Sequence, residues 1–220
     1  MADYQHELAD NIHCTTTLGK IVCVGRNYAD HAKELNNPIP KQPLLFIKPA
    51  TAAVPMTSPL VIPQGLGECH HEVEMALLIG QRLTAANREQ VLAAIAGVGL
   101  ALDLTLRDIQ AELKQKGQPW ERAKAFDGSC PLSAFVAVAD TDLASLPLKL
   151  YRNNQLQQSG NTDQMVFAIA DLLVAISASF TLLPGDVVLT GTPAGVGPLL
   201  SGDSLRACLG GLLEIETTVA

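Results

Sequence analysis

The stretch Glu68–Gly80, ECHHEVEMALLIG, places two carboxylates at the start of a run that is otherwise apolar. Residues i and i+2 of a β-strand point to the same face, so Glu72 and Glu74 stand side by side. The residues after them are apolar on both faces, which predicts a buried strand. Unpaired carboxylates are costly to bury, so this pair requires basic partners, protons or a cation.

A third acid follows in GLALDLTLRD, Gly99–Asp108. On a strand, Asp103 shares its face with small residues, which leave room for a ligand. Three carboxylates without His or Cys at ligand spacing indicate a hard divalent cation, Mg²⁺ or Mn²⁺ before Ca²⁺. The alternative is that each acid pairs with one of the 15 Lys and Arg residues.

His70 and His71 raise the alternative of a zinc site. Adjacent residues of a strand face opposite ways, so the two imidazoles do not readily share one ion with the glutamates. We therefore expect His71 to act through hydrogen bonds.

Three further segments carry polar chemistry. In GRNYADHAKEL, His31 and Glu34 lie three residues apart and are neighbours on a helical face. This spacing fits a pair that transfers protons, and it fits equally an ordinary pair on a helix surface. TGTPAGVG, 190–197, is not a phosphate-binding P-loop, but its N–H groups and the Thr192 hydroxyl could face a carboxylate. Lys124 fits either a surface charge or a buried electrophile.

The composition favours a single enzyme-sized domain. The chain has 220 residues, 48% of them hydrophobic, and a formal net charge of −7. That charge and the absence of a basic cluster argue against nucleic acid as a partner, and no run is apolar for long enough to predict a membrane helix. The N-terminal segment lacks the pattern of a secretory signal, so we expect a cytoplasmic protein. Five scattered cysteines without a CxxC pair predict free thiols.

The periodicity predicts an arm at 1–18 and one β-rich α+β domain at 19–220. We expect helices at 26–37, 87–98, 107–117 and 162–180, the last capped by Thr162 or Asp163. We expect strands at 20–25, 43–49, 58–63, 72–79, 99–106 and 133–140. A hairpin is expected at 148–160, with its turn at Asn153 and Asn154. The last 37 residues predict a strand, a Gly-rich loop and a final strand pair.

Six motifs together resemble the fumarylacetoacetate hydrolase family, in its short single-domain branch of acylpyruvate hydrolases and hydroxymuconate isomerases. They are VGRNYADHAKEL, FIKP, HHEVEMALLIG, ALDLTLRDIQ, WERAKAFDGSCP and GDVVLTGTPAGVGP, in this order. The resemblance implies a mixed β-sandwich roll, a homodimer and a bound Mg²⁺ or Mn²⁺, with Ca²⁺ also allowed.

The resemblance also implies roles for individual residues. Glu72, Glu74 and Asp103 would hold the metal, His31 and Glu34 would activate water on a lid helix, and Lys124 would stabilise negative charge. The residues implied to line the substrate pocket are Arg26, Tyr28, Lys48, Arg107, Gln110 and Thr192.

The activity implied first is hydrolysis of the C–C bond of acylpyruvates such as acetylpyruvate or fumarylpyruvate, through a metal-bound pyruvate enolate. The same enolate serves an isomerase, tautomerase or decarboxylase acting on oxaloacetate or 2-hydroxymuconate-type dicarboxylic acids, which is the alternative. A third hypothesis is a non-catalytic binder of metal and small dicarboxylates, which would have no need for His31 and Glu34.

Overall fold

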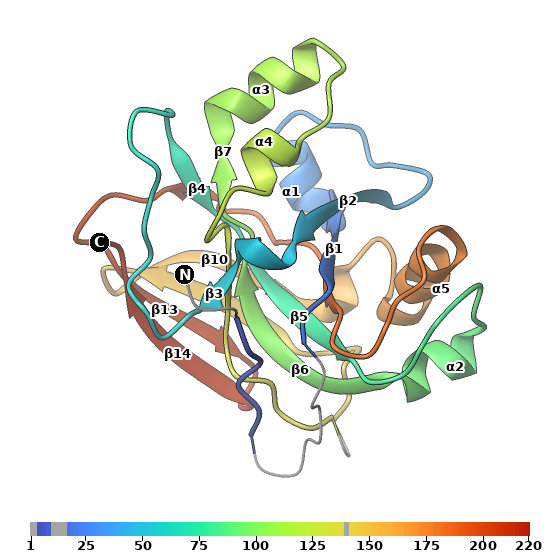
Figure 1. Cartoon of the computed structure of the whole chain (residues 1–220). Helices are drawn as coiled ribbons and strands as arrows, with labels where there is room; N and C mark the ends of the chain where they lie inside the picture. Colours follow the sequence, from blue (N-terminus) through green and yellow to red (C-terminus); the bar gives the residue numbers. More distant parts are fainter. Residues whose placement is uncertain (1–3, 10–16, 139–140) are drawn as a thin grey trace.

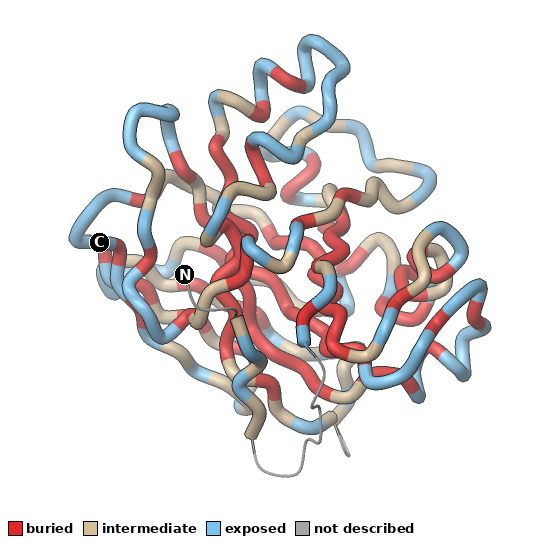
Figure 2. Tube along the Cα trace, viewed as in Figure 1, coloured by how far each residue is buried: buried red, intermediate tan, exposed pale blue. Residues whose placement is uncertain are grey.

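The most apolar stretches of the chain form the two central strands of the fold. In the computed structural model, which describes residues 4–9, 17–138 and 141–220, β5 (Val73–Ile79) pairs antiparallel with β6 (Ile95–Leu102). Every residue of β5 is buried, and Figure 2 shows these strands as the buried centre of the molecule. The prediction of a buried strand after the glutamate pair is confirmed.

The strands form three sheets, and β5 and β6 lie within the largest (Figure 1). The seven-stranded sheet has the order β2 (Leu44–Pro49), β1 (Lys20–Gly25), β11 (Val187–Leu189), β5, β6, β8 (Cys130–Leu132), β3 (Ala53–Pro55). The four-stranded sheet has the order β10 (Gln155–Asn161), β9 (Pro147–Arg152), β13 (Ser204–Leu209), β14 (Leu213–Thr218). The three-stranded sheet has the order β12 (Gly197–Pro198), β4 (Cys69–His71), β7 (Thr105–Leu106). The predicted β-rich α+β class is confirmed.

The main core lies between the seven-stranded and four-stranded sheets. Leu100 of β6 belongs to the same buried cluster as Leu148 and Leu150 of β9 and Leu205 of β13. A second cluster covers the other face of the large sheet, and Tyr4 and Leu8 pack against it. The described residues 4–9 thus lie on the domain, where Ala9 donates to the Phe135 carbonyl.

The helices are short and lie in two groups. They are α1 (Ala29–Glu34), α2 (Arg88–Ala93), α3 (Arg107–Gln115), α4 (Glu121–Lys124) and α5 (Ile169–Ser179), with 3₁₀ turns at Ala50–Ala52 and Thr162–Gln164. Figure 1 shows α1, α3 and α4 near one another at the top, and α2 beside α5 at the right. No helix among the described residues is long and apolar enough to cross a membrane.

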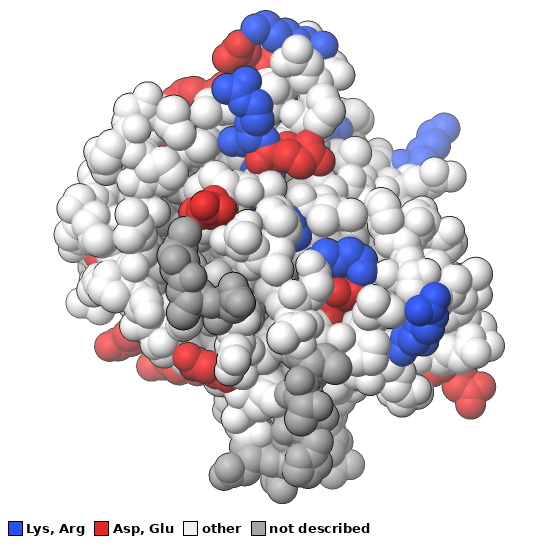
Figure 3. Space-filling view, in the orientation of Figure 1, with Lys and Arg blue, Asp and Glu red and all other residues white. Residues whose placement is uncertain are grey.

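The charged side chains on the face in Figure 3 are of both signs. Acidic and basic groups lie next to one another over the upper helices, the region of α3 and α4.

Several predicted elements are confirmed. β1, β2 and α3 occur where they were expected, and α3 is followed by Gly117 at a φ of 61°. Asn153 and Asn154 join β9 to β10 with φ angles of 51° and 64°, the left-handed conformation that a type I′ hairpin turn requires.

Other predicted boundaries are wrong. The helix at 87–98 ends at Ala93, because the following residues enter β6 beside β5. The helix at 162–180 begins only at Ile169, and Thr162 starts a 3₁₀ turn that Asn161 caps. Residues 58–63 and 133–138 form only isolated bridges, and 139–140 lie outside the described residues.

Asn27 explains the late start of α5. Its side chain accepts from Phe167 N at 2.7 Å and donates to the Phe167 and Thr190 carbonyls at 3.1 and 2.8 Å. Its own carbonyl accepts from Val166 N at 2.8 Å. These bonds occupy backbone groups before Ile169 that helix formation would otherwise use.

We expect Asn27→Leu to lower the free energy of unfolding by about 2–4 kcal/mol, because the change leaves buried N–H and C=O groups without partners. Urea denaturation followed by circular dichroism measures this loss. Gln118→Leu, at an exposed position, serves as control with a change within about 0.5 kcal/mol. Equal stability of both variants would contradict the role given to Asn27.

Candidate active site

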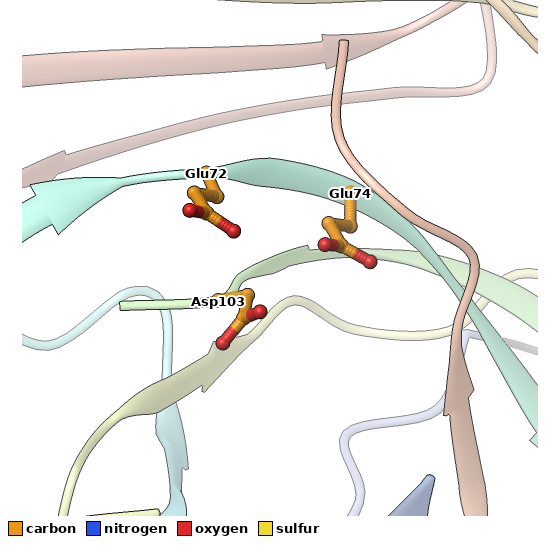
Figure 4. A group of neighbouring side chains, drawn as sticks. All are labelled: Glu72, Glu74 and Asp103. Carbon is orange, nitrogen blue, oxygen red and sulfur yellow. The ribbon is translucent and has the colours of Figure 1, made fainter. Parts of the chain in front are cut away.

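The three predicted carboxylates converge where the two central strands begin and end. Glu72 lies in the break between β4 and β5, Glu74 lies in β5, and Asp103 directly follows β6. Asp103 N donates to the Glu72 carbonyl at 2.8 Å, and Glu74 is paired with Ala101. Each carboxylate offers an oxygen within 4.8 Å of the other two, and Figure 4 shows them pointing toward a shared space.

Glu72 and Asp103 are joined by basic side chains from two helices. Lys124, at the end of α4, donates to Glu72 Oε2 at 2.8 Å and to Asp103 Oδ2 at 2.6 Å. Arg107, at the start of α3, donates to Glu72 Oε1 at 2.5 Å. Burial opposes ionisation of Glu72, but the charges of Lys124 and Arg107 outweigh it and hold its pKa below the usual range. Burial likewise opposes the charge on Lys124, whose pKa is nevertheless raised by Asp103 and Glu72.

Glu74 lacks such compensation. Its described hydrogen-bond donor is Gly191 N, 2.6 Å from Oε2. Burial, followed by the negative charges of Asp103 and Glu72, raises the pKa of Glu74 well above its usual range. Glu74 therefore keeps its proton to a higher pH than an ordinary glutamate when no cation is bound.

The donor set fits a hard divalent cation. All three side chains offer carboxylate oxygens, and buried Asp103 Oδ1 has no hydrogen-bond partner among the described residues. Lys48 Nζ lies 2.9 Å from this oxygen, but its orientation does not make a hydrogen bond. A cation would engage the free oxygen and replace the proton on Glu74.

A narrow cavity of about 40 Å³ opens from the acids toward α1 and α3. The residues that line it include ones predicted to bind metal, to act in catalysis and to contact substrate. They are Arg26, His31, Glu72, Glu74, Asp103, Arg107, Gln110, Lys124 and Thr192. Tyr28 and Lys48 are buried outside this lining. Lys48 lies behind Asp103, where it donates to the carbonyls of Lys124 and Ser129, so its position does not support the expected substrate contact.

The predicted pair on α1 is formed and anchored. His31 Nδ1 lies 3.3 Å from Glu34 Oε2. Gly195 N lies 3.0 and 3.2 Å from the two Glu34 oxygens. Because an ionised carboxylate only accepts hydrogen bonds, Nδ1 is the donor to Glu34, and Nε2 is the ring nitrogen that has no hydrogen-bond partner among the described residues. The Gly-rich loop thus does bind carboxylates through N–H groups, but these are Glu74 and Glu34 of the protein itself.

Gln158 was not found by sequence reasoning. It is fully buried, and its Oε1 accepts from His71 Nδ1 at 2.9 Å and Val73 N at 3.0 Å, on either side of Glu72. Its Nε2 donates to Thr192 Oγ1 at 2.7 Å and to the Pro193 carbonyl at 2.8 Å. A break in the register of β10 at this point accompanies the inward side chain. Gln158 therefore fixes the backbone around Glu72, and buried His71 makes the hydrogen bond that was expected of it.

Lys114 was also missed. It lines the mouth of the cavity from α3 and donates to Asn37 Oδ1 at 3.1 Å. An amphipathic helix usually directs its lysines to solvent, so its sequence gives no signal for this position.

Residues 20–220 match the fumarylacetoacetate hydrolase C-terminal domain. The chain belongs to the fumarylacetoacetate hydrolase family. It is 50% identical over 210 residues to oxaloacetate tautomerase YcgM of Escherichia coli K12, covering 94% of this chain and 96% of the relative.

Two solved structures of the family extend the comparison. The fumarylpyruvate hydrolase of Pseudomonas aeruginosa, in complex with Mn²⁺ and pyruvate, superposes with a TM-score of 0.93 at 32% identity and covers 100% of this chain and 97% of its own. The 5-carboxymethyl-2-hydroxymuconate delta-isomerase of Mycobacterium smegmatis superposes with a TM-score of 0.81 at 35% identity, over 92% of this chain and 79% of its own. Tautomerase, hydrolase and isomerase names thus all occur among the relatives.

We expect Gln158→Leu to destabilise the protein by about 2–4 kcal/mol, because Val73 N and Thr192 lose a buried partner. Its Mn²⁺ affinity should fall about 10- to 100-fold, as for loss of a group that orients metal ligands. Denaturation and Mn²⁺ titration by calorimetry measure the two effects. Gln155→Leu, exposed on the same strand, should change neither. Unchanged Mn²⁺ affinity in Gln158→Leu would contradict the positioning role.

The metal-free protein should lose stability as pH rises above 4.5. The raised pKa of Glu74 means that the folded state keeps a proton that the unfolded chain releases near its ordinary value of 4.5. The native state then binds more protons, so the free energy of unfolding falls with increasing pH until the folded-state pKa is passed.

Denaturation between pH 5 and 9 in the presence of a chelator tests this slope. Glu74→Gln should remove it and raise stability at the alkaline end, whereas exposed Glu89→Gln should leave it unchanged. A slope that survives in Glu74→Gln would assign the titration to another group.

Proposed function

We propose that the protein is a divalent-metal-dependent tautomerase that interconverts the enol and keto forms of oxaloacetate. The observation that carries this proposal is the cavity in which His31 faces a three-carboxylate cluster with Lys124 at its side. The named activity of the 50% identical relative supports the substrate. Relative to the sequence-based expectation of acylpyruvate hydrolysis, the comparisons favour the alternative.

The residues present fit Mg²⁺ or Mn²⁺ on Glu72, Glu74 and Asp103. When bound, such an ion supplies Lewis-acid stabilisation of negative charge on the oxygens of a 2-oxo acid. The Mn²⁺ in the related fumarylpyruvate hydrolase supports a divalent ion in this chain.

Tautomerisation moves one proton between the C2 oxygen and C3 of oxaloacetate. In the enol-to-keto direction, the enol hydroxyl gives its proton to His31 Nε2, and the protonated imidazole then gives a proton to C3, so His31 ends in its starting state. Lys124 and Arg107 place positive charge beside the acids, which stabilises the enolate between the two transfers. His31 exchanges the proton at C3 through Nε2, while Glu34 holds Nδ1 and Gly195 N holds Glu34.

Acylpyruvate hydrolysis is the second candidate. Its support is the anchored His31 and Glu34 pair, which suits activation of water, and the structural relative named as a fumarylpyruvate hydrolase. This reaction adds water to the distal carbonyl, breaks the C–C bond, and releases a carboxylic acid and pyruvate.

A cytoplasmic location and a homodimer remain proposals. The described cysteines, Cys23, Cys69, Cys130 and Cys208, are free, as a reducing compartment requires, and Cys14 lies outside the described residues. Sedimentation equilibrium tests the dimer directly.

The metal-stripped protein should not catalyse ketonisation of enol-oxaloacetate, and Mg²⁺ or Mn²⁺ should restore the reaction. His31→Ala in the metal-loaded protein should lower kcat about 10²- to 10⁴-fold, the usual contribution of a positioned acid-base group. Loss of the enol absorbance in the ultraviolet measures the rate. Asp30→Ala, which removes an exposed partner of Lys33 on the same helix, is the matched control.

Product analysis by NMR with acetylpyruvate and fumarylpyruvate separates the two candidates. Release of pyruvate and free acid at a higher kcat/KM than oxaloacetate ketonisation would overturn the tautomerase proposal in favour of the hydrolase. Activity of the metal-stripped protein equal to that of the loaded protein would contradict both.

A further inference from the structure

Two cations at the mouth of the cavity have no acidic partner among the described residues. Arg26 and Lys114 both line the cavity, and neither makes an ion pair. The deeper cations differ, since Lys124 and Arg107 are bonded to Glu72. The cavity has four basic and three acidic lining residues, so a divalent ion on the acids leaves an excess of positive charge.

Arg26 is held in a strained conformation toward this mouth. It directly follows β1 with a φ of 62°, in the left-handed region that non-glycine side chains rarely adopt. Such strain is retained where the surrounding structure and function require it. Asn27, the next residue, is fully buried and bonded to Phe167 and Thr190, so it fixes the chain at this point.

Lys114, on α3, is the second of these two cations. Its described partner, Asn37 Oδ1, is a neutral amide oxygen just beyond α1, so its charge is not neutralised. Burial, followed by repulsion from Arg26 and Arg107, lowers the pKa of Lys114. An anion at the mouth would relieve this repulsion.

We propose that Arg26 and Lys114 form a subsite for the distal carboxylate of a four-carbon 2-oxo dicarboxylic acid. The subsite makes the cavity prefer dianionic ligands over monoanionic ligands of the same length. This inference rests on the proposed function in placing the 2-oxo acid end at the three carboxylates. Its consequence is that selectivity between oxaloacetate and monoanionic acylpyruvates such as acetylpyruvate lies at the mouth, because the deeper residues contact the part that both ligands share.

Two stable hydroxy acids isolate the distal group. (S)-Malate and (S)-2-hydroxybutyrate both present a carboxylate and a 2-hydroxyl, and differ in whether the chain ends in a carboxylate or a methyl group. Neither is a keto–enol substrate, so their binding to the Mn²⁺-loaded protein, measured by calorimetry, does not depend on turnover. We expect the wild-type protein to bind malate at least tenfold more tightly.

The variants are chosen to change charge with little change in the backbone. Arg26→Asn should lower the malate affinity about tenfold, since asparagine tolerates a positive φ. Lys114→Gln should lower it about threefold, because this side chain is exposed to solvent. Both variants should leave the affinity for 2-hydroxybutyrate unchanged. Lys114→Arg, which keeps the positive charge, should retain the wild-type preference for malate. Lys116→Gln, whose lysine pairs with exposed Glu112 nearby, is the control.

Equal binding of the two ligands by the wild-type protein would overturn the subsite. Equal weakening of both ligands in Arg26→Asn and Lys114→Gln would also overturn it, because a purely structural defect does not distinguish the distal group. A malate preference that the variants remove, in a protein that fails to ketonise oxaloacetate, would support the subsite and refute the tautomerase proposal. The two hypotheses therefore fail separately.

Discussion

The site depends on the two ion pairs that the ammonium group of Lys124 makes with buried carboxylates. This group is bonded to Glu72 and Asp103 at once, and these like charges would repel each other in a buried position without it. The carbonyl of the same residue accepts from Lys48, whose Nζ lies 2.9 Å from Asp103 Oδ1 without making a hydrogen bond to it. Only Glu74 is left without a basic partner in the described site. The fold thus compensates two of three charges and leaves the third for a proton or a metal.

The loop at 190–195 connects the acids to the helix above them. Gly191 N is bonded to Glu74, and Gly195 N is bonded to Glu34 on α1. A Cβ at Gly195 would lie 2.0 Å from the Gln157 carbonyl oxygen, and the residue has a φ of 96°, so only glycine fits there. Because this short backbone segment contacts both groups, a shift of β10 would move Glu74 and the His31–Glu34 pair together.

The features that the sequence predicted depend on residues close together in the chain, whereas those that it did not predict depend on contacts between distant residues. Apolar runs identified β5, and Asn153–Asn154 identified the hairpin, because both features depend on neighbouring residues. The acids at 72, 74 and 103 could be grouped since adjacent strands place them side by side. Gln158 lies 86 residues beyond Glu72, and no short-range pattern marks a glutamine as buried. Lys48 was assigned to the substrate side of the site, whereas burial behind Asp103 gives it a supporting position.

The geometry of Glu34 bears on which proton transfer the site favours. Both of its oxygens lie within hydrogen-bonding distance of Gly195 N, and one also holds His31 Nδ1. A carboxylate engaged in this way orients the imidazole. His31 faces the cavity, where Nε2 is the atom free to exchange a proton with a ligand carbon. Tautomerisation requires only this exchange, whereas hydrolysis also requires a water molecule placed beside the pair. The arrangement of Gly195, Glu34 and His31 is therefore the feature of the site that supports the proposed tautomerase over the hydrolase.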